Sequence, residues 1–84
     1  MVQDEKIREA QEVLDWAIMQ GNGSIKCKVI NYKYNSYRVQ FFTKDQKLIM
    51  PVQIDEQDVK ETKPKENVIS DKLKTLLKNL EAYS

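Results

Sequence analysis

Basic and aromatic residues alternate with apolar ones between Gly23 and Phe42, in the stretch GSIKCKVINYKYNSYRVQFF. Ammonium and guanidinium groups attract phosphates and carboxylates, and aromatic rings can stack on unpaired bases with about 1–3 kcal/mol per base. A two-residue alternation places every second side chain on the same side of a β-strand. We therefore predict that one face of a sheet carries a contact surface made of Lys26, Lys28, Tyr32, Arg38 and Phe42.

Two functions fit this predicted surface. Lysine and arginine beside aromatic rings suit single-stranded nucleic acid, bound weakly and with little regard to base sequence. Tyrosine and phenylalanine also favour strands for packing reasons, and lysine on a solvent face discourages edge aggregation, so an ordinary or protein-contacting sheet has the same appearance. Residues 21–54 carry six basic side chains and one acidic side chain, but the whole chain has a net charge of only +1. Nucleic-acid binders are usually more basic, which makes protein contact the first expectation and nucleic acid the alternative.

Catalytic chemistry is not expected. Cys27 is the only cysteine and histidine is absent, which leaves no internal disulfide and no tetrahedral zinc site made of cysteine and histidine within one chain. Cys27 should lie between Ile25 and Val29 on the inward side of a strand, with no histidine to help form a thiolate. The Walker A, GxGxxG, GxSxG and HExxH patterns do not occur. We predict no catalytic, cofactor-binding or metal-binding residue, and the protein is not expected to be an enzyme.

The acidic residues have structural explanations. Those between Asp4 and Asp15 fall mostly on the solvent side of a predicted helix, where each should be ionised. Asp55, Glu56 and Asp58 lack the glycine turn and the terminal glutamate of a calcium loop. Asp55 is instead predicted to cap a short helical turn over residues 56–60, because its carboxylate can accept from free backbone donors.

Hydrophobic periodicity predicts the elements that position these residues. Apolar residues three and four apart indicate an amphipathic helix over about 3–20, which ends at the glycines that follow. From Ser24 the period falls to two, which indicates antiparallel strands over about 24–32, 37–43 and 47–54. Pro51 cannot donate to a ladder, so the third strand should be an edge strand or be broken there. The inward face of the first two strands should carry Ile25, Cys27, Val29, Tyr37, Val39 and Phe41.

The C-terminal part begins with a polar segment. Residues of about 60–67, which include ETKPKEN, are predicted to form an exposed linker that tolerates disorder. A helix over about 68–83 should follow, with an apolar stripe made of Ile69, Leu73, Leu76, Leu77, Leu80 and Tyr83. The 84 residues are expected to form a single domain, residues 1–84. The predicted fold class is α+β, with an N-terminal helix, a three-stranded antiparallel meander and a C-terminal amphipathic helix.

The order α-β-β-β-α resembles that of double-stranded-RNA-binding domains. Those domains usually present a lysine-rich start to their last helix after a very short connection. In this chain an acidic segment and ETKPKEN precede that helix, which begins Val68-Ile69-Ser70-Asp71-Lys72. The likeness is one of topology, and topology does not carry function.

Partners and location follow from the same patterns. Ile30, Tyr32, Phe42 and Ile49 on the second sheet face, together with the last helix, offer more apolar surface than one packed layer hides, which indicates a protein partner or a homodimer. The N-terminal MVQDEKIREAQEV lacks the apolar core of a signal peptide, so a cytoplasmic protein with no membrane contact is expected. The expected function is that of a small non-enzymatic interaction module, acting through the sheet face or the last helix.

Overall fold

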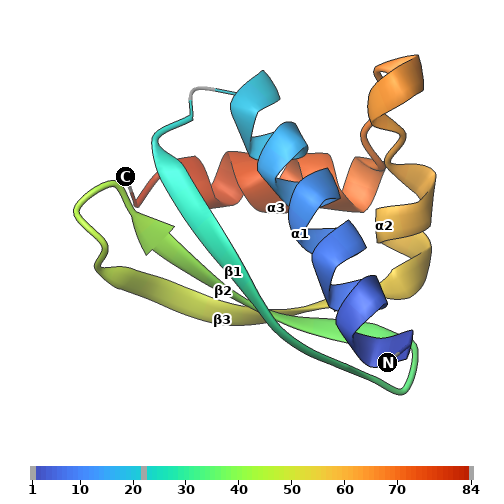
Figure 1. Ribbon diagram of the computed structural model, residues 1–84. Coiled ribbons are helices and arrows are strands. Elements are labelled where there is room, and N and C mark those ends of the chain that lie inside the picture. Colours follow the sequence, from blue (N-terminus) through green and yellow to red (C-terminus); the bar gives the residue numbers. More distant parts are fainter. Residues whose placement is uncertain (1, 22, 84) are drawn as a thin grey trace.

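The computed structural model describes residues 2–21 and 23–83 of the 84-residue chain. The elements are α1 (Val2–Gln20), β1 (Ile25–Lys33), β2 (Ser36–Thr43), β3 (Leu48–Asp55), α2 (Glu56–Glu61), a 3-10 turn η1 (Pro64–Glu66) and α3 (Asp71–Glu81) (Figure 1). The strands form one antiparallel sheet in the order β1-β2-β3. The predicted α+β fold, a three-stranded meander between an N-terminal and a C-terminal helix, is therefore confirmed.

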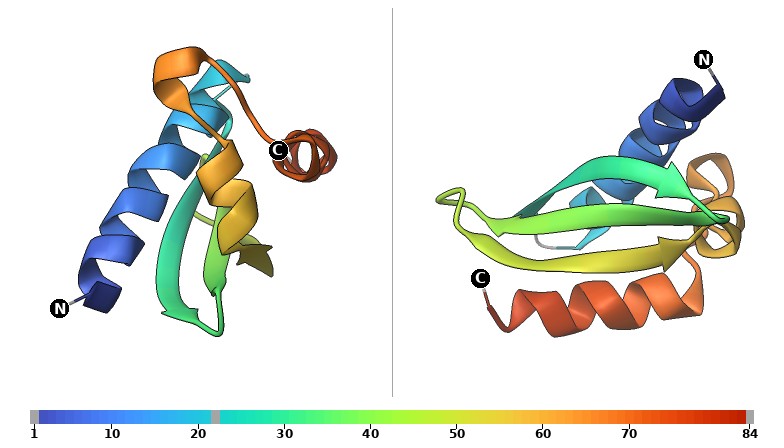
Figure 2. Two further views of the ribbon diagram at one scale, coloured as in Figure 1. Left: turned by 90° about the vertical axis from the view of Figure 1, so that its right-hand side faces the viewer. Right: turned by 90° about the horizontal axis from the view of Figure 1, so that it is seen from below.

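Both long helices pack on the same side of the sheet (Figures 1 and 2). The core lies between them and the strands, and Val39 and Phe41 at the centre of the sheet are completely buried. The α1 side chains Ala10, Leu14, Ala17 and Ile18 and the α3 side chains Leu73, Leu77 and Leu80 complete one hydrophobic cluster with the sheet. Apolar spacings of three and four create these helix faces because they repeat with the helical period. Within residues 2–21 and 23–83, no helix covers the opposite face of the sheet.

The first hairpin turns at Tyr34 and Asn35, both in the left-handed backbone region with φ of 53° and 59°. Positive φ at both central positions is the signature of a type I′ turn, whose twist matches that of the flanking strands. Two irregularities modify the ladders beyond this turn. The β1–β2 register skips Ile30, and the β2–β3 register skips Ile49. Each skipped residue is a β-bulge, which shifts the alternation of the residues that follow it.

The outer edge of β1 is closed by α1. The side-chain amide of Gln11 donates to the Cys27 carbonyl at 3.0 Å and accepts from the Val29 backbone N–H at 2.8 Å. It therefore replaces the backbone of a neighbouring strand. The amide of Gln3 donates to the Tyr32 carbonyl at 2.6 Å in the same way. These contacts satisfy edge groups that would otherwise be open to another chain.

The other edge of the sheet is β3, which continues unbroken through Pro51. The backbone groups of Cys27 and Val29 point outward, toward Gln11. Phe41 is the partner of Cys27, and in an antiparallel sheet its backbone groups therefore point toward β3. Those of its other partner, Met50, point back toward β2. The nitrogen of Pro51 then faces the free edge. Of the two alternatives predicted for this strand, the structure shows the edge strand.

The polar segment predicted as a linker over 60–67 is exposed in large part but is folded into a closed turn. Lys63 and Val68 form an antiparallel bridge around η1, and Asn67 has a φ of 59°. The buried Thr62 hydroxyl donates to the Asp58 carbonyl at 2.9 Å and accepts from the Ser70 N–H at 3.1 Å. These bonds connect α2 to the start of α3, so the segment is not a loose connection.

The helix starts differ from the predicted ones for reasons of capping. Ser70 caps α3, with its hydroxyl accepting from the Leu73 N–H at 3.2 Å, so this helix begins at Asp71 rather than near residue 68. Asp55 occupies the N-cap position of α2 but its side chain makes no capping bond. Its carboxylate accepts from the Ser36 hydroxyl at 3.4 Å instead, so the predicted side-chain cap is wrong.

Candidate contact surface

The uncovered side of the sheet is named the open face here. The strand register places its residues, because Lys26 pairs with Phe42, Lys28 with Gln40, and Arg38 with both Asn31 and Gln53. The open face consists of Lys26, Lys28, Ile30, Asn31 and Lys33 from β1, Arg38, Gln40 and Phe42 from β2, and Leu48, Pro51 and Gln53 from β3. Four of these side chains are basic, and the register adds one acidic side chain on the same side of the sheet, Asp55, which pairs with Ser36. Asp55 lies at one end, bonded to Ser36.

Four of the five residues predicted for the contact surface lie on the open face. Lys26, Lys28 and Arg38 are exposed, and Phe42 is half-buried. They come together because the two-residue alternation holds along β1 as far as Val29 and along β2 throughout. The structure therefore collects the basic residues of this segment on one surface, away from both long helices (Figure 2).

Tyr32 is the exception, and its predicted place on this surface is wrong. The bulge at Ile30 reverses the alternation, so Tyr32 pairs with Tyr37 on the helix side of the sheet, with the ring centres 4.9 Å apart. A strict alternation would have turned Asn31 and Lys33 inward, and the bulge leaves both of them exposed. This polar pair was the signal in the sequence that the alternation had to change.

Tyr32 belongs to a cluster around the buried carboxylate of Glu56 that the sequence did not predict. The Tyr32 hydroxyl donates to Glu56 Oε1 at 2.9 Å, Lys6 Nζ binds Glu56 Oε2, and Lys60 Nζ lies 3.9 Å from the same oxygen. Lys6 Nζ also lies 5.0 Å from the centre of the Tyr32 ring. The hydroxyl of Tyr32 is also 3.2 Å from Asn35 Oδ1. The cluster ties α1, β1 and α2 together.

The electrostatics of this cluster favour its charged form. The hydrogen bond from Lys6, followed by that from Tyr32, holds the pKa of Glu56 below its usual value, and the bond to Glu56 raises the pKa of Lys6. Burial first, and then the bond to Glu56, raises the pKa of Tyr32. A carboxylate with both oxygens bound and a lowered pKa is a poor proton acceptor. The cluster is therefore suited to holding the fold together rather than to acid–base chemistry.

Substitution of Glu56 by glutamine is expected to lower the stability of the protein at neutral pH. Because the pKa of Glu56 is lower in the folded protein than the usual 4.5, the ionised carboxylate stabilises the fold above that pH and loses this contribution as the pH falls through the folded value. Urea unfolding at pH 7 and at pH 3 should show a larger wild-type advantage at pH 7 than at pH 3. The exposed Glu12→Gln is the matched control, and an equal loss in both variants would contradict the assignment.

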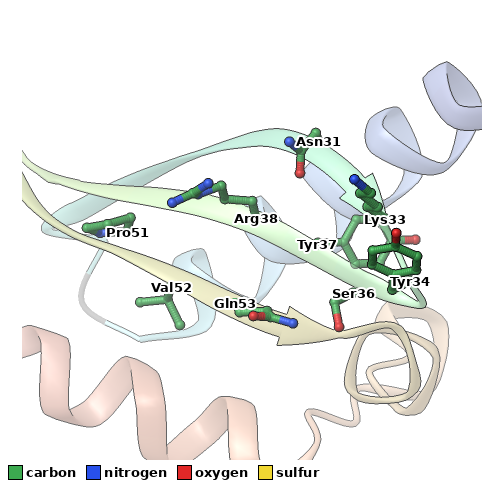
Figure 3. A pocket seen from close by; sticks show the side chains of 9 residues that line it. All are labelled: Asn31, Lys33, Tyr34, Ser36, Tyr37, Arg38, Pro51, Val52 and Gln53. Carbon is green, nitrogen blue, oxygen red and sulfur yellow. The ribbon is translucent and has the colours of Figure 1, made fainter.

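A groove of about 470 Å³ lies at the hairpin end of the open face (Figure 3). It is lined by Asn31, Lys33, Tyr34, Ser36, Tyr37, Arg38, Pro51, Val52 and Gln53. No carboxylate belongs to this lining, while a guanidinium, an ammonium and two amides do. Lys33 Nζ lies 5.0 Å from the ring centre of Tyr34, which is 86% exposed at the turn. Such a lining suits an anionic group beside an apolar one.

Cys27 is half-buried, and its surroundings disfavour the thiolate. Burial, followed by the nearby Asp15 carboxylate, raises the pKa of Cys27 to about 12. Its Sγ lies 3.6 Å from both Asp15 Oδ1 and Gln11 Nε2. A nucleophilic cysteine needs a cationic neighbour or a base and a lowered pKa. Cys27 has the opposite environment.

The described residues, 2–21 and 23–83, contain neither a metal-binding cluster nor a membrane-spanning helix. No group of three or more histidine, cysteine, aspartate or glutamate side chains in this part of the chain is placed to hold a metal ion. None of the helices there is long and apolar enough to cross a membrane.

Comparison with protein-family models, with curated proteins and with solved structures gives no match for this chain. A functional hypothesis for this chain rests on the open face, because that face carries most of the predicted contact residues and the groove beside Arg38.

Proposed function

We propose that the protein is a small non-enzymatic interaction module of the cytoplasm that binds a partner protein through the open face. The observation that supports this proposal is a whole sheet face without a covering helix, on which apolar and basic side chains are mixed. Ile30 is 38% exposed and Leu48 is 53% exposed on that face, close in the register to the lysines and Arg38. Apolar side chains within a charged rim are the usual anatomy of a protein interface.

The position of Tyr32 bears on the choice between protein and nucleic acid. A sheet that binds single strands presents several aromatic rings on which successive bases stack. With Tyr32 on the helix side, the open face retains the half-buried Phe42, and Tyr34 stands at the turn. The aliphatic residues Ile30, Leu48 and Pro51 are better suited to packing against protein side chains than to stacking on bases.

Nucleic acid is the second candidate, favoured by one observation. The groove near Arg38 combines cationic and amide side chains without a carboxylate. An anionic strand could place a phosphate there and run along the basic side chains of β1. Such binding would be electrostatic and would depend steeply on salt.

Site-specific photocrosslinking from the open face tests the proposal. A crosslinking amino acid at Gln40, which lies between Lys28 and Pro51 in the register, should form adducts with protein in the cells that produce this chain. The same group at Glu12, on the outer side of α1, should not form these adducts. Adding Arg38→Glu should lower the yield of this adduct by about tenfold, because the substitution reverses a charge on the open face and so lowers its affinity for the partner. Adducts that form equally from both positions would contradict the proposal.

The nucleic-acid arm uses a labelled single strand and fluorescence anisotropy. For single strands, the slope of the logarithm of the association constant against the logarithm of the salt concentration is about −0.7 per phosphate contact. If all four basic side chains of the open face contact phosphates, the affinity should therefore fall roughly 50-fold between 50 and 200 mM salt. Arg38→Gln should then make this slope less steep by the amount that corresponds to one phosphate contact, about 0.7. No binding at 50 mM salt would eliminate the second candidate. Binding of the strand together with crosslinks to nucleic acid alone would replace the first candidate by the second.

A further inference from the structure

The groove at the hairpin end of the open face narrows the class of partner that this face can bind. Asn31, Arg38 and Gln53 lie side by side across the three strands, because Arg38 pairs with both of the others. All three line the groove and are exposed. Within residues 2–21 and 23–83, their side chains make no hydrogen bond and no ion pair. This row of amide, guanidinium and amide groups is therefore available to a ligand.

The two cations of the groove lie apart. Lys33 lies beside Tyr34 at the turn, with 5.0 Å between its Nζ and the ring centre. Arg38 extends in the other direction, toward the Pro51 end of the groove (Figure 3). A single compact anion is held best by donors that converge on it. Two separated cations suit instead a longer ligand that brings one anionic group to each of them.

The charge around the groove favours an acidic ligand. Lys26 and Lys28 continue the basic side chains along β1 on the same side of the sheet. Like Lys33 and Arg38, they form no ion pair with another residue that the structure describes. Asp55 at the end of β3 is the only acidic residue of the three strands. Four basic side chains thus stand against one carboxylate, and carboxylates on a partner would complement them.

The amides and the apolar lining favour a polypeptide over nucleic acid. A side-chain amide has both a donor and an acceptor, and so has each peptide group, whereas the phosphodiester backbone offers acceptors only. Asn31 and Gln53 can therefore each pair fully with the backbone of a polypeptide. Pro51 and Val52 in the same lining suit contact with aliphatic side chains. Tyr34 is the one exposed ring of the groove, and sheets that bind single strands present several.

We infer that the open face binds an acidic, extended segment of its partner protein. One carboxylate of this segment binds Lys33 and a second binds Arg38. The amides of Asn31 and Gln53 bind its backbone. The inference rests on the proposed function and names the chemistry of the partner. Because the basic groups are exposed, each charge pair contributes little, and binding needs several carboxylates and weakens with salt.

Fluorescence anisotropy with a defined peptide tests this acidic segment. The probe is a capped, fluorescein-labelled peptide of about eight residues, long enough to follow a strand, with glutamates around one central leucine. At about 50 mM salt the full chain should bind it with a dissociation constant below about 1 mM. The same peptide with glutamine in place of every glutamate should bind at least about tenfold more weakly. Arg38→Gln and Lys33→Gln should each weaken binding of the acidic peptide about fivefold, because each removes one exposed charge pair.

Lys74→Gln is the matched control, because it removes an exposed lysine from α3, which packs on the other side of the sheet. It should leave the affinity for the acidic peptide unchanged, and circular dichroism checks the fold of each variant. In NMR spectra of the isotope-labelled chain, the side-chain amide signals of Asn31 and Gln53 should shift as the peptide is added. Equal weakening in Lys74→Gln and Arg38→Gln would mean unspecific attraction of charge and would overturn the inference. Amide signals that stay in place would overturn it as well.

The outcomes also separate this inference from the proposed function. Protein adducts from the crosslinker at Gln40, together with no binding of the acidic peptide, would support the interaction module and overturn the acidic segment. Peptide binding that depends on Arg38, without protein adducts from Gln40, would support the acidic-ligand site and contradict the proposed function. An oligothymidine of the same length that binds more tightly than the peptide, with the same dependence on Arg38, would overturn the inference in favour of nucleic acid.

Discussion

Replacement of Phe41 by alanine is expected to reduce the free energy of unfolding by about 3–5 kcal/mol. The side chain is completely buried on the central strand, between Cys27 and Met50 of the neighbouring strands. Its removal costs the transfer free energy of the ring and leaves a cavity that the surrounding residues fill only in part. A domain of this length has a total stability of about 4–13 kcal/mol. The variant should therefore lose a large part of the stability of the domain, which urea titration followed by circular dichroism would measure.

Phe42 supplies the matched control, since it is the same residue type one position further along the chain. It lies on the open face and is half-buried there. Phe42→Ala should cost only about 1 kcal/mol, because it removes less contact and leaves no closed cavity. Equal losses in the two variants would mean that the helices do not pack on the Phe41 side alone.

Gln11→Ala is expected to reduce the free energy of unfolding by about 1–3 kcal/mol, because the variant removes the hydrogen-bond partners of two groups on the β1 edge. These groups are the Cys27 carbonyl and the Val29 N–H. The amide proton of Val29 should also exchange with solvent much faster, which NMR would detect. Opening of this edge should increase aggregation on storage.

Two further variants separate this effect from general damage to α1. Gln11→Glu keeps an acceptor for the Val29 N–H but loses the donor to the Cys27 carbonyl, so it should protect Val29 better than alanine does. Glu12→Ala changes the adjacent, exposed residue and should leave the exchange of Val29 unchanged. Unchanged exchange in Gln11→Ala would show that the amide does not take the place of a strand.

The local elements of this fold could be predicted well because each has a local cause. The alternation of lysines with Ile25, Cys27 and Val29 predicts both the strand and its inward face, and the structure agrees as far as Val29. The start of α3 was predicted about three residues early, because apolar periodicity runs past Ser70 while the cap depends on a single hydroxyl. The bulge at Ile30 interrupts the alternation, and the position of Tyr32 was wrong for that reason alone.

The contacts that could not be predicted join residues far apart in the chain. Lys6 and Glu56 are 50 residues apart, and neither has a neighbour whose spacing indicates the other. Glu56 appeared to belong with Asp55 and Asp58 because the three are close in sequence, although its bonds go to α1 and β1. The amide of Gln11 is similar, since nothing local distinguishes it from a solvated glutamine. The side of the sheet that α3 covers is also a tertiary property, and it decides which face stays open.

The protection of both sheet edges has a consequence for how this protein can assemble. A strand edge with free donors and acceptors acts as a template for the next chain, and repetition of that step yields filaments. Gln11 occupies two backbone groups of one edge and Pro51 removes a donor from the other, so neither edge offers an uninterrupted row of donors and acceptors for strand-by-strand growth. At high concentration we therefore expect this chain to resist the stepwise strand addition that builds filaments, and Gln11 and Pro51 are the two residues whose replacement should remove that resistance.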